Sequence, residues 1–79
     1  MRAKLVISNV NQCEGGNEQL TFRGVCRSDS YPADGSDENN TYAKFSPSVE
    51  LKITISNPAL YGQFKPGQKF YVDFTETPQ

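Results

Sequence analysis

The sequence has no histidine and no tryptophan, and only two cysteines and one methionine in 79 residues. Without histidine, the side chain that most often moves protons near neutral pH is missing, and so is the imidazole of most zinc sites. No glycine-rich loop ends in Gly-Lys-Ser or Gly-Lys-Thr, the pattern that cradles phosphates in nucleotide hydrolases. We therefore expect a protein that is not an enzyme and that uses no cofactor or metal ion.

An excess of either charge is also missing. Eight basic and nine acidic side chains give a formal net charge of -1, so the chain as a whole offers no broad positive field to nucleic acid. The apolar stretch near the N-terminus, Leu5-Val6-Ile7, is too short for a signal peptide or a membrane span. These features disfavour nucleic acid as a partner and predict no membrane partner.

The two cysteines, Cys13 and Cys26, lie in one expected hairpin, the first in its turn and the second near the far end of a strand. A disulfide requires the two Cα atoms to lie within about 7 Å of each other. We therefore expect two reduced thiols.

Short runs in which apolar and polar residues alternate dominate the rest of the chain, and this period of two is typical of strands with one buried face. In the clearest run Val49, Leu51, Ile53 and Ile55 alternate with polar residues, so all four are predicted to lie in the core. A shorter stretch, residues 42–46, is a candidate for a fifth strand. The four main strands are predicted at residues 3–10, 18–27, 49–56 and 70–75.

Three turns are predicted between these strands. The glycine pair Gly15-Gly16 favours a tight hairpin turn within residues 11–17. Asn57-Pro58 is typical of a helix start, and the resulting short helix at 58–61 is expected to end at Gly62 in a left-handed conformation. Residues 65–68, Lys-Pro-Gly-Gln, predict a type II turn in which glycine takes the position of positive φ.

The segment 28–41 is rich in Ser, Asp, Asn, Gly and Pro, and we predict a mobile polar loop that is too polar to bury. Its acidic residues lack the alternating ligands, central glycine and closing glutamate of a calcium loop. Residues 76–79 are expected to fray. The four acidic residues of the loop are Asp29, Asp34, Asp37 and Glu38.

Taken together, these elements predict one small domain over residues 1–79, all-β with one short helix. The expected architecture is a four- to five-stranded antiparallel sheet or barrel, OB-like or SH3-like. A half-open sheet that forms a homo-oligomer through an edge is the competing architecture.

Aromatic side chains interleaved with basic ones are the candidates for binding, because stacking platforms flanked by cations are typical of single-strand nucleic-acid binders. Aromatic residues in strands also serve as core or cross-strand partners. The candidate binding surface comprises Tyr42, Tyr61, Phe64, Tyr71, Lys65 and Lys69.

Residues 57–75, NPALYGQFKPGQKFYVDFT, resemble the C-terminal signature of small uncharacterised proteins of tailed bacteriophages. The Glu14-Gly15-Gly16 turn and the segment 43–48, AKFSPS, are similar as well. The resemblance carries no catalytic residues. It implies a phage protein made in the host bacterial cytoplasm, with association to the virion left open.

The leading hypothesis is therefore a phage accessory module that binds a protein, either a host factor or a virion component, through a sheet edge or the aromatic region around residues 58–64. The alternative is an OB-like module that binds single-stranded nucleic acid. A small nucleotide held in a pocket or between subunits stays open as a third reading.

Overall fold

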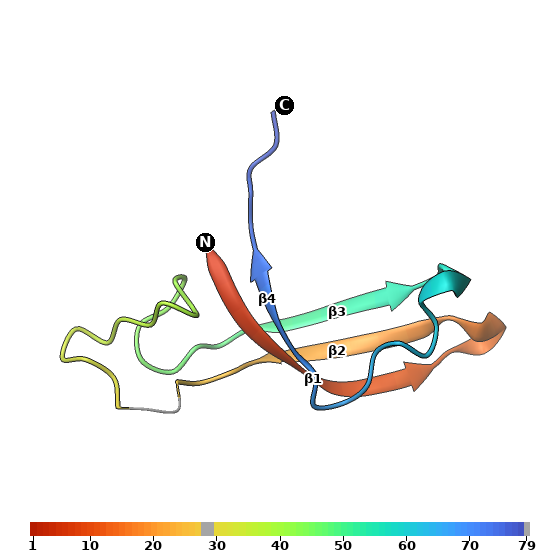
Figure 1. The fold of residues 1–79 in the computed structure, drawn as a ribbon, viewed down its shortest axis with the longest axis horizontal. Coiled ribbons are helices and arrows are strands. Elements are labelled where there is room, and N and C mark those ends of the chain that lie inside the picture. Colours follow the sequence, from red (N-terminus) through yellow and green to blue (C-terminus); the bar gives the residue numbers. More distant parts are fainter. Residues whose placement is uncertain (28–29, 79) are drawn as a thin grey trace.

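The computed structural model describes residues 1–27 and 30–78 and contains one four-stranded antiparallel sheet (Figure 1). The strands are β1 (Arg2–Gln12), β2 (Glu18–Gly24), β3 (Glu50–Ile55) and β4 (Lys69–Asp73), in the order β3-β2-β1-β4. Two short 3-10 turns, η1 (Glu14–Gly16) and η2 (Pro58–Leu60), are the only helical elements among the described residues. The predicted small all-β fold with an antiparallel sheet is confirmed.

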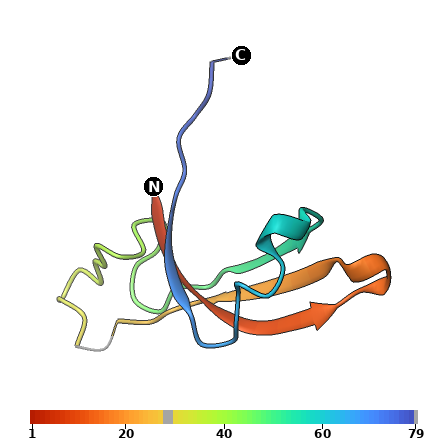
Figure 2. The same ribbon diagram turned by 45° about the vertical axis from the view of Figure 1, so that its right-hand side comes forward.

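The sheet is open, because β3 and β4 lie at its opposite edges and do not pair with each other. Figures 1 and 2 show β4 and the first half of β1 turning away from the direction of β2 and β3. The molecule is thin, with extents of 49 × 34 × 16 Å. Of the predicted architectures, the structure has the open sheet and not the closed barrel.

A β-bulge in β1 changes which of its residues face the core. Before the bulge the odd residues Ala3, Leu5 and Ile7 are buried, while after it Val10 lies opposite Leu20 of β2. The register shifts between Ile7 and Asn9. The extra residue bends the strand and increases its twist, which accounts for the change of direction in Figure 1.

The core lies on one face of the sheet, hereafter the apolar face. Among the described residues, the buried hydrophobic ones come only from the two inner strands, because each of these strands is flanked by a strand on both sides. Residues from both edge strands and from the connections pack around them without being fully buried. The buried hydrophobic residues are Ala3, Leu5, Ile7, Leu20 and Phe22.

The connection between β2 and β3 completes the pairing of β1. β2 ends near the middle of β1, and Asn40 and Thr41 bind the part of the β1 backbone that β2 leaves unpaired. The Thr41 amide donates to the Arg2 carbonyl at 2.9 Å, and the Lys4 amide donates to Asn40 Oδ1 at 2.9 Å. Asn40 is fully buried and Asp37 is 4% exposed. The expectation that this segment is too polar to bury is wrong at these two positions. The reason is that buried backbone amides need hydrogen-bond partners, and polar side chains of this segment supply them.

The mobility of segment 28–41 stays a prediction, as does the fraying of residues 76–79; residues 28, 29 and 79 lie outside the described residues. Asp29 of the acidic loop is one of these.

The segment after β3 covers the hairpin end of the apolar face. The Asn57 side chain accepts from the Ala59 amide and starts η2, as predicted, and Gly62 has a φ of 78°. Gly67 has a φ of 94° and the Gln68 amide donates to the Lys65 carbonyl, which confirms the predicted turn. The buried carboxylate of Glu18 fixes this segment by accepting from the Gly62 amide at 2.9 Å.

Three expectations at individual positions are wrong. The strand predicted over residues 18–27 ends at Gly24, so Cys26 lies beyond it and is exposed. Residues 42–46 form no strand. Ile53 does lie on the apolar face, but it is 38% exposed because β3 is an edge strand with nothing beyond it.

Candidate binding surfaces

Among the described residues, the outer edge of β4 is a row of backbone groups that pair with no other strand. The Phe74 amide donates to the Met1 carbonyl and the Ile7 amide donates to the Gln68 carbonyl, each at 2.9 Å. In an antiparallel ladder the hydrogen-bonded residues alternate, so the even residues of β4 turn their backbone groups toward β1. The backbone groups of Lys69, Tyr71 and Asp73 consequently point toward the free edge.

Exposed apolar side chains adjoin that edge. Phe70 is 37% exposed and Phe74 is 56% exposed. The ring of Phe70 is fixed between two others, with its centroid 6.1 Å from that of Phe22 and 6.0 Å from that of Phe64. These separations are typical of favourable aromatic pairs. The edge of β4 therefore combines free backbone groups with an ordered apolar surface.

The opposite face of the sheet, hereafter the polar face, carries the odd-numbered side chains of β4. Tyr71 is 53% exposed, and its hydroxyl donates to Asn39 Oδ1 at 2.9 Å. The Arg2 guanidinium lies 4.7 Å from the centre of the Tyr71 ring and pairs with Asp73 at 2.8 Å. The hydrogen bond from Arg2 and its charge hold the pKa of Asp73 below its usual range, although partial burial acts in the opposite sense.

The six residues of the predicted binding surface do not meet at one place. Tyr71 and Lys69 lie on the polar face of β4. Phe64 packs on the core from the apolar face, and Tyr61 is at the hairpin end, where its hydroxyl donates to Asn17. Two residues remain: Tyr42 packs against the core from the loop, and Lys65 begins the turn before β4.

The hydroxyl of Tyr42 is buried and has no hydrogen-bond partner among the described residues. Burial, followed by the negative charge of Asp37, raises the pKa of Tyr42. The hydroxyl is therefore held neutral, and a side chain at Gly24 would approach it to 3.4 Å. Its ring packs against the core, so this residue contributes to the packing of the loop.

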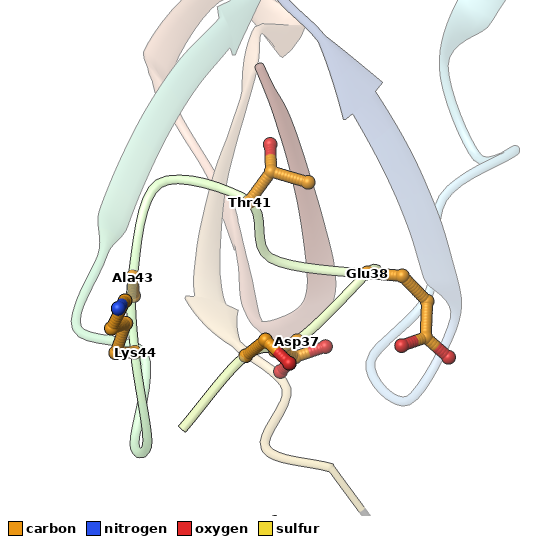
Figure 3. A pocket seen from close by; sticks show the side chains of 6 residues that line it. Asp37, Glu38, Thr41, Ala43 and Lys44 are labelled. Carbon is orange, nitrogen blue, oxygen red and sulfur yellow. The ribbon is translucent and has the colours of Figure 1, made fainter. Parts of the chain in front are cut away.

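A shallow hollow of about 320 Å³ is formed by one loop (Figure 3). In Figure 3, Lys44 and Glu38 stand on opposite sides of it, and Asp37 lies between them at its lower end. The Asp37 carboxylate accepts hydrogen bonds from the Asn39 amide and the Asn40 side chain. Its oxygens are thus engaged within the loop, and among the described residues no ion pair joins Lys44 to Asp37 or Glu38.

Elsewhere in the described residues, the side chains that could bind a metal ion or react as nucleophiles do not form a cluster. Within residues 1–27 and 30–78 no group of three or more Cys, Asp or Glu side chains is placed to hold a metal ion. Cys13 and Cys26 are free cysteines, as predicted, and both are exposed. No helix in the described part of the chain is long and apolar enough to cross a membrane.

Comparisons with known proteins return no family model, no curated protein and no solved structure that matches this chain. The features of this chain that bear on its function are the two faces of the sheet and the edge of β4.

Proposed function

We propose that this chain is a non-catalytic binding module that adds an extended, apolar segment of another protein to the free edge of β4. The observation that supports the proposal best is the juxtaposition of the outward backbone of Tyr71 with the exposed rings of Phe70 and Phe74. In strand addition, main-chain hydrogen bonds supply affinity and pockets for alternate side chains supply specificity.

The two edges of the sheet differ in how well they are protected. β3 carries the charged residues Glu50 and Lys52, which pair at 3.8 Å. Charged side chains on an edge strand discourage pairing with another chain. β4 also begins and ends with a charged residue, but between them it offers an exposed aromatic residue on each face, Phe70 and Tyr71. The edge of β4 is therefore the better acceptor.

The resemblance of residues 57–75 to tailed-phage proteins supports an accessory role during infection. On that reading the partner is a host factor or a virion component, encountered in the bacterial cytoplasm or on the particle. Its binding segment is extended and places apolar side chains beside Phe70 and Phe74.

The test uses two substitutions of one residue. Tyr71→Pro removes an amide that points to the free edge, a position where proline is tolerated. Tyr71→Thr keeps the amide and removes the same ring, so it is the matched control. Tagged protein is used to capture partners from the host lysate, and circular dichroism melts verify that both variants fold.

We expect wild type and Tyr71→Thr to capture the same protein and Tyr71→Pro to lose it. Equal capture by both variants would show that the edge is not used. Recovery of only a second copy of this chain would replace the foreign partner with self-association.

A further inference from the structure

The charges of this chain are divided between surfaces, although their sum is close to zero. Strand alternation places most basic residues opposite the core, on the polar face. Six basic and three acidic side chains give that face a net charge of +3, whereas two basic and six acidic ones give the rest of the sequence -4. The polar face carries Arg2, Lys4, Arg23, Arg27, Lys52 and Lys69 together with Glu38, Glu50 and Asp73.

Three of these cations have no carboxylate partner among the described residues. Ion pairs engage Arg2, Arg27 and Lys52, but not Lys4, Arg23 or Lys69. The register places these three around Val6: Arg23 of β2 and Lys69 of β4 both lie opposite Val6, and Lys4 is the preceding residue of β1 on that face. Neighbouring strands are about 4.8 Å apart, so the backbone positions of Lys4, Arg23 and Lys69 lie within about two strand spacings of one another, and these three residues are hereafter the cluster. Glu50 of β3 also lies opposite Arg23 on this face.

The cluster borders a hollow of about 290 Å³. Lys4, Lys69 and Arg27 line it together with Asn39. Arg27 Nη1 lies 3.4 Å from a carboxylate oxygen of Glu38, whose side chain is 79% exposed. A long ion pair in which one partner is largely exposed is weak, so an incoming anion can compete with Glu38 for Arg27, whose side chain is 25% exposed.

An aromatic platform stands beside the cluster. Tyr71 occupies the next position after Lys69 on the polar face of β4, directly opposite Lys4. Its ring is fixed by the Arg2 guanidinium and by the hydroxyl's bond to Asn39. A half-exposed, fixed ring next to unpaired cations is the combination that single-strand binders use, because every base has a face that can stack.

We propose that the polar face binds single-stranded nucleic acid, with Lys4, Arg23 and Lys69 contacting phosphates and Tyr71 stacking on a base. A single strand suits this flat surface because its bases are free to stack, whereas those of a duplex are already stacked. The site faces away from Phe70 and Phe74, so it is a second activity beyond the binding of a protein segment.

The probe is a fluorescently labelled oligothymidylate, titrated by anisotropy with the full-length protein over a series of salt concentrations. Three phosphate contacts predict a slope of about -2 in log affinity against log salt, at about -0.7 for each contact. Lys69→Glu and Lys4→Glu each weaken binding at low salt and flatten the slope by about 0.7 to 1. Tyr71→Leu weakens binding at least about fivefold.

Lys65→Glu is the matched control, because it makes the same charge change in the turn at 65–68, outside the cluster. It leaves the slope and the affinity close to those of wild type. Equal losses for Lys65→Glu and Lys69→Glu would overturn the site by showing a response to net charge alone. Absence of binding at low salt would overturn it as well.

Inorganic phosphate distinguishes an isolated anion site from a strand site. At constant ionic strength, phosphate that displaces the oligonucleotide no better than chloride supports binding along a strand. Specific displacement would assign the hollow to a free anion and contradict the proposal. Melting curves accompany each variant; if Lys4→Glu is unfolded, Lys69→Glu, at an exposed position, decides the outcome.

Discussion

Leu20 of β2 and Ile53 of β3 lie directly opposite each other on the apolar face, yet Leu20 is 1% exposed and Ile53 is 38% exposed. The difference follows from their places in the sheet. Leu20 is flanked by Ile53 on one side and by Val10 of β1 on the other, whereas β3 has no further strand beyond it. Burial in this thin fold is therefore set by strand order more than by side-chain type.

This pair gives a direct test of the packing. We expect Leu20→Ala to lower the free energy of unfolding by about 3 kcal/mol, since it empties a buried site, and Ile53→Ala to lower it by about 1 kcal/mol. Urea denaturation of both variants measures the two losses. Equal losses would mean that β3 is covered in solution by something that this fold does not contain.

Asn40 is expected to contribute as much to the free energy of unfolding as a core residue does. Its side chain donates to the Val25 carbonyl and to Asp37, and accepts from the Lys4 amide. Asn40→Ala leaves buried backbone groups unpaired and should cost about 2 to 4 kcal/mol. Ser36→Ala, at an exposed position of the same loop, is the control and should cost less than about 0.5 kcal/mol in the same urea titration.

The stability of the loop should depend on pH through Asp37. Burial raises the pKa of Asp37, but hydrogen bonds from Asn40 and Asn39 outweigh burial and leave the pKa below its usual value. A carboxyl with a lowered pKa in the folded state stabilises the fold fully above its unfolded pKa of about 3.9 and loses that contribution as pH falls further.

Wild type should consequently melt above Asp37→Asn at neutral pH, with the gap between their melting temperatures narrowing below about pH 4. Melting curves of both proteins from pH 7 down to acid conditions measure the gap. A gap that stays constant with pH would show that the carboxylate charge is not what the loop uses.

Substitutions at two glycines with positive φ distinguish the cost of backbone strain from the cost of a steric clash. Gly35 has a φ of 75°, and a side chain there would meet the Phe45 ring at 2.5 Å; Gly67 has a φ of 94° and open space around it. Gly67→Ala should cost about 1 to 2 kcal/mol from strain alone. Gly35→Ala should cost clearly more, and equal losses in urea would show that the Phe45 ring moves aside without penalty.

Much of the sheet follows from the alternation of single residues. Ala3, Leu5 and Ile7 occupy alternate positions, as do Leu20 and Phe22, and the structure buries all five. The β-bulge does not follow from this alternation. Ser8 and Asn9 are ordinary strand-end residues, and nothing in the local sequence shows that the inward-facing positions shift there. The sequence therefore does not predict the bulge.

The anchoring of the loop also depends on information that is not local. Asn40 stands among Ser, Asp and Asn residues that look alike in sequence, and only the early end of β2 leaves Arg2 and Lys4 with backbone groups to pair. The polar face can be predicted from the sequence. Arg2 and Lys4 alternate with core residues, so their shared face follows from strand periodicity even though the net charge conceals it.

The most direct test of the proposed function is amide hydrogen exchange along β4, measured by NMR without and with the captured partner. In the isolated protein the amides of Phe70 and Val72 should exchange slowly, because they face β1, and that of Tyr71 should exchange quickly. With the partner bound, the Tyr71 amide should become protected. A Tyr71 amide that exchanges quickly in the complex would contradict strand addition at this edge.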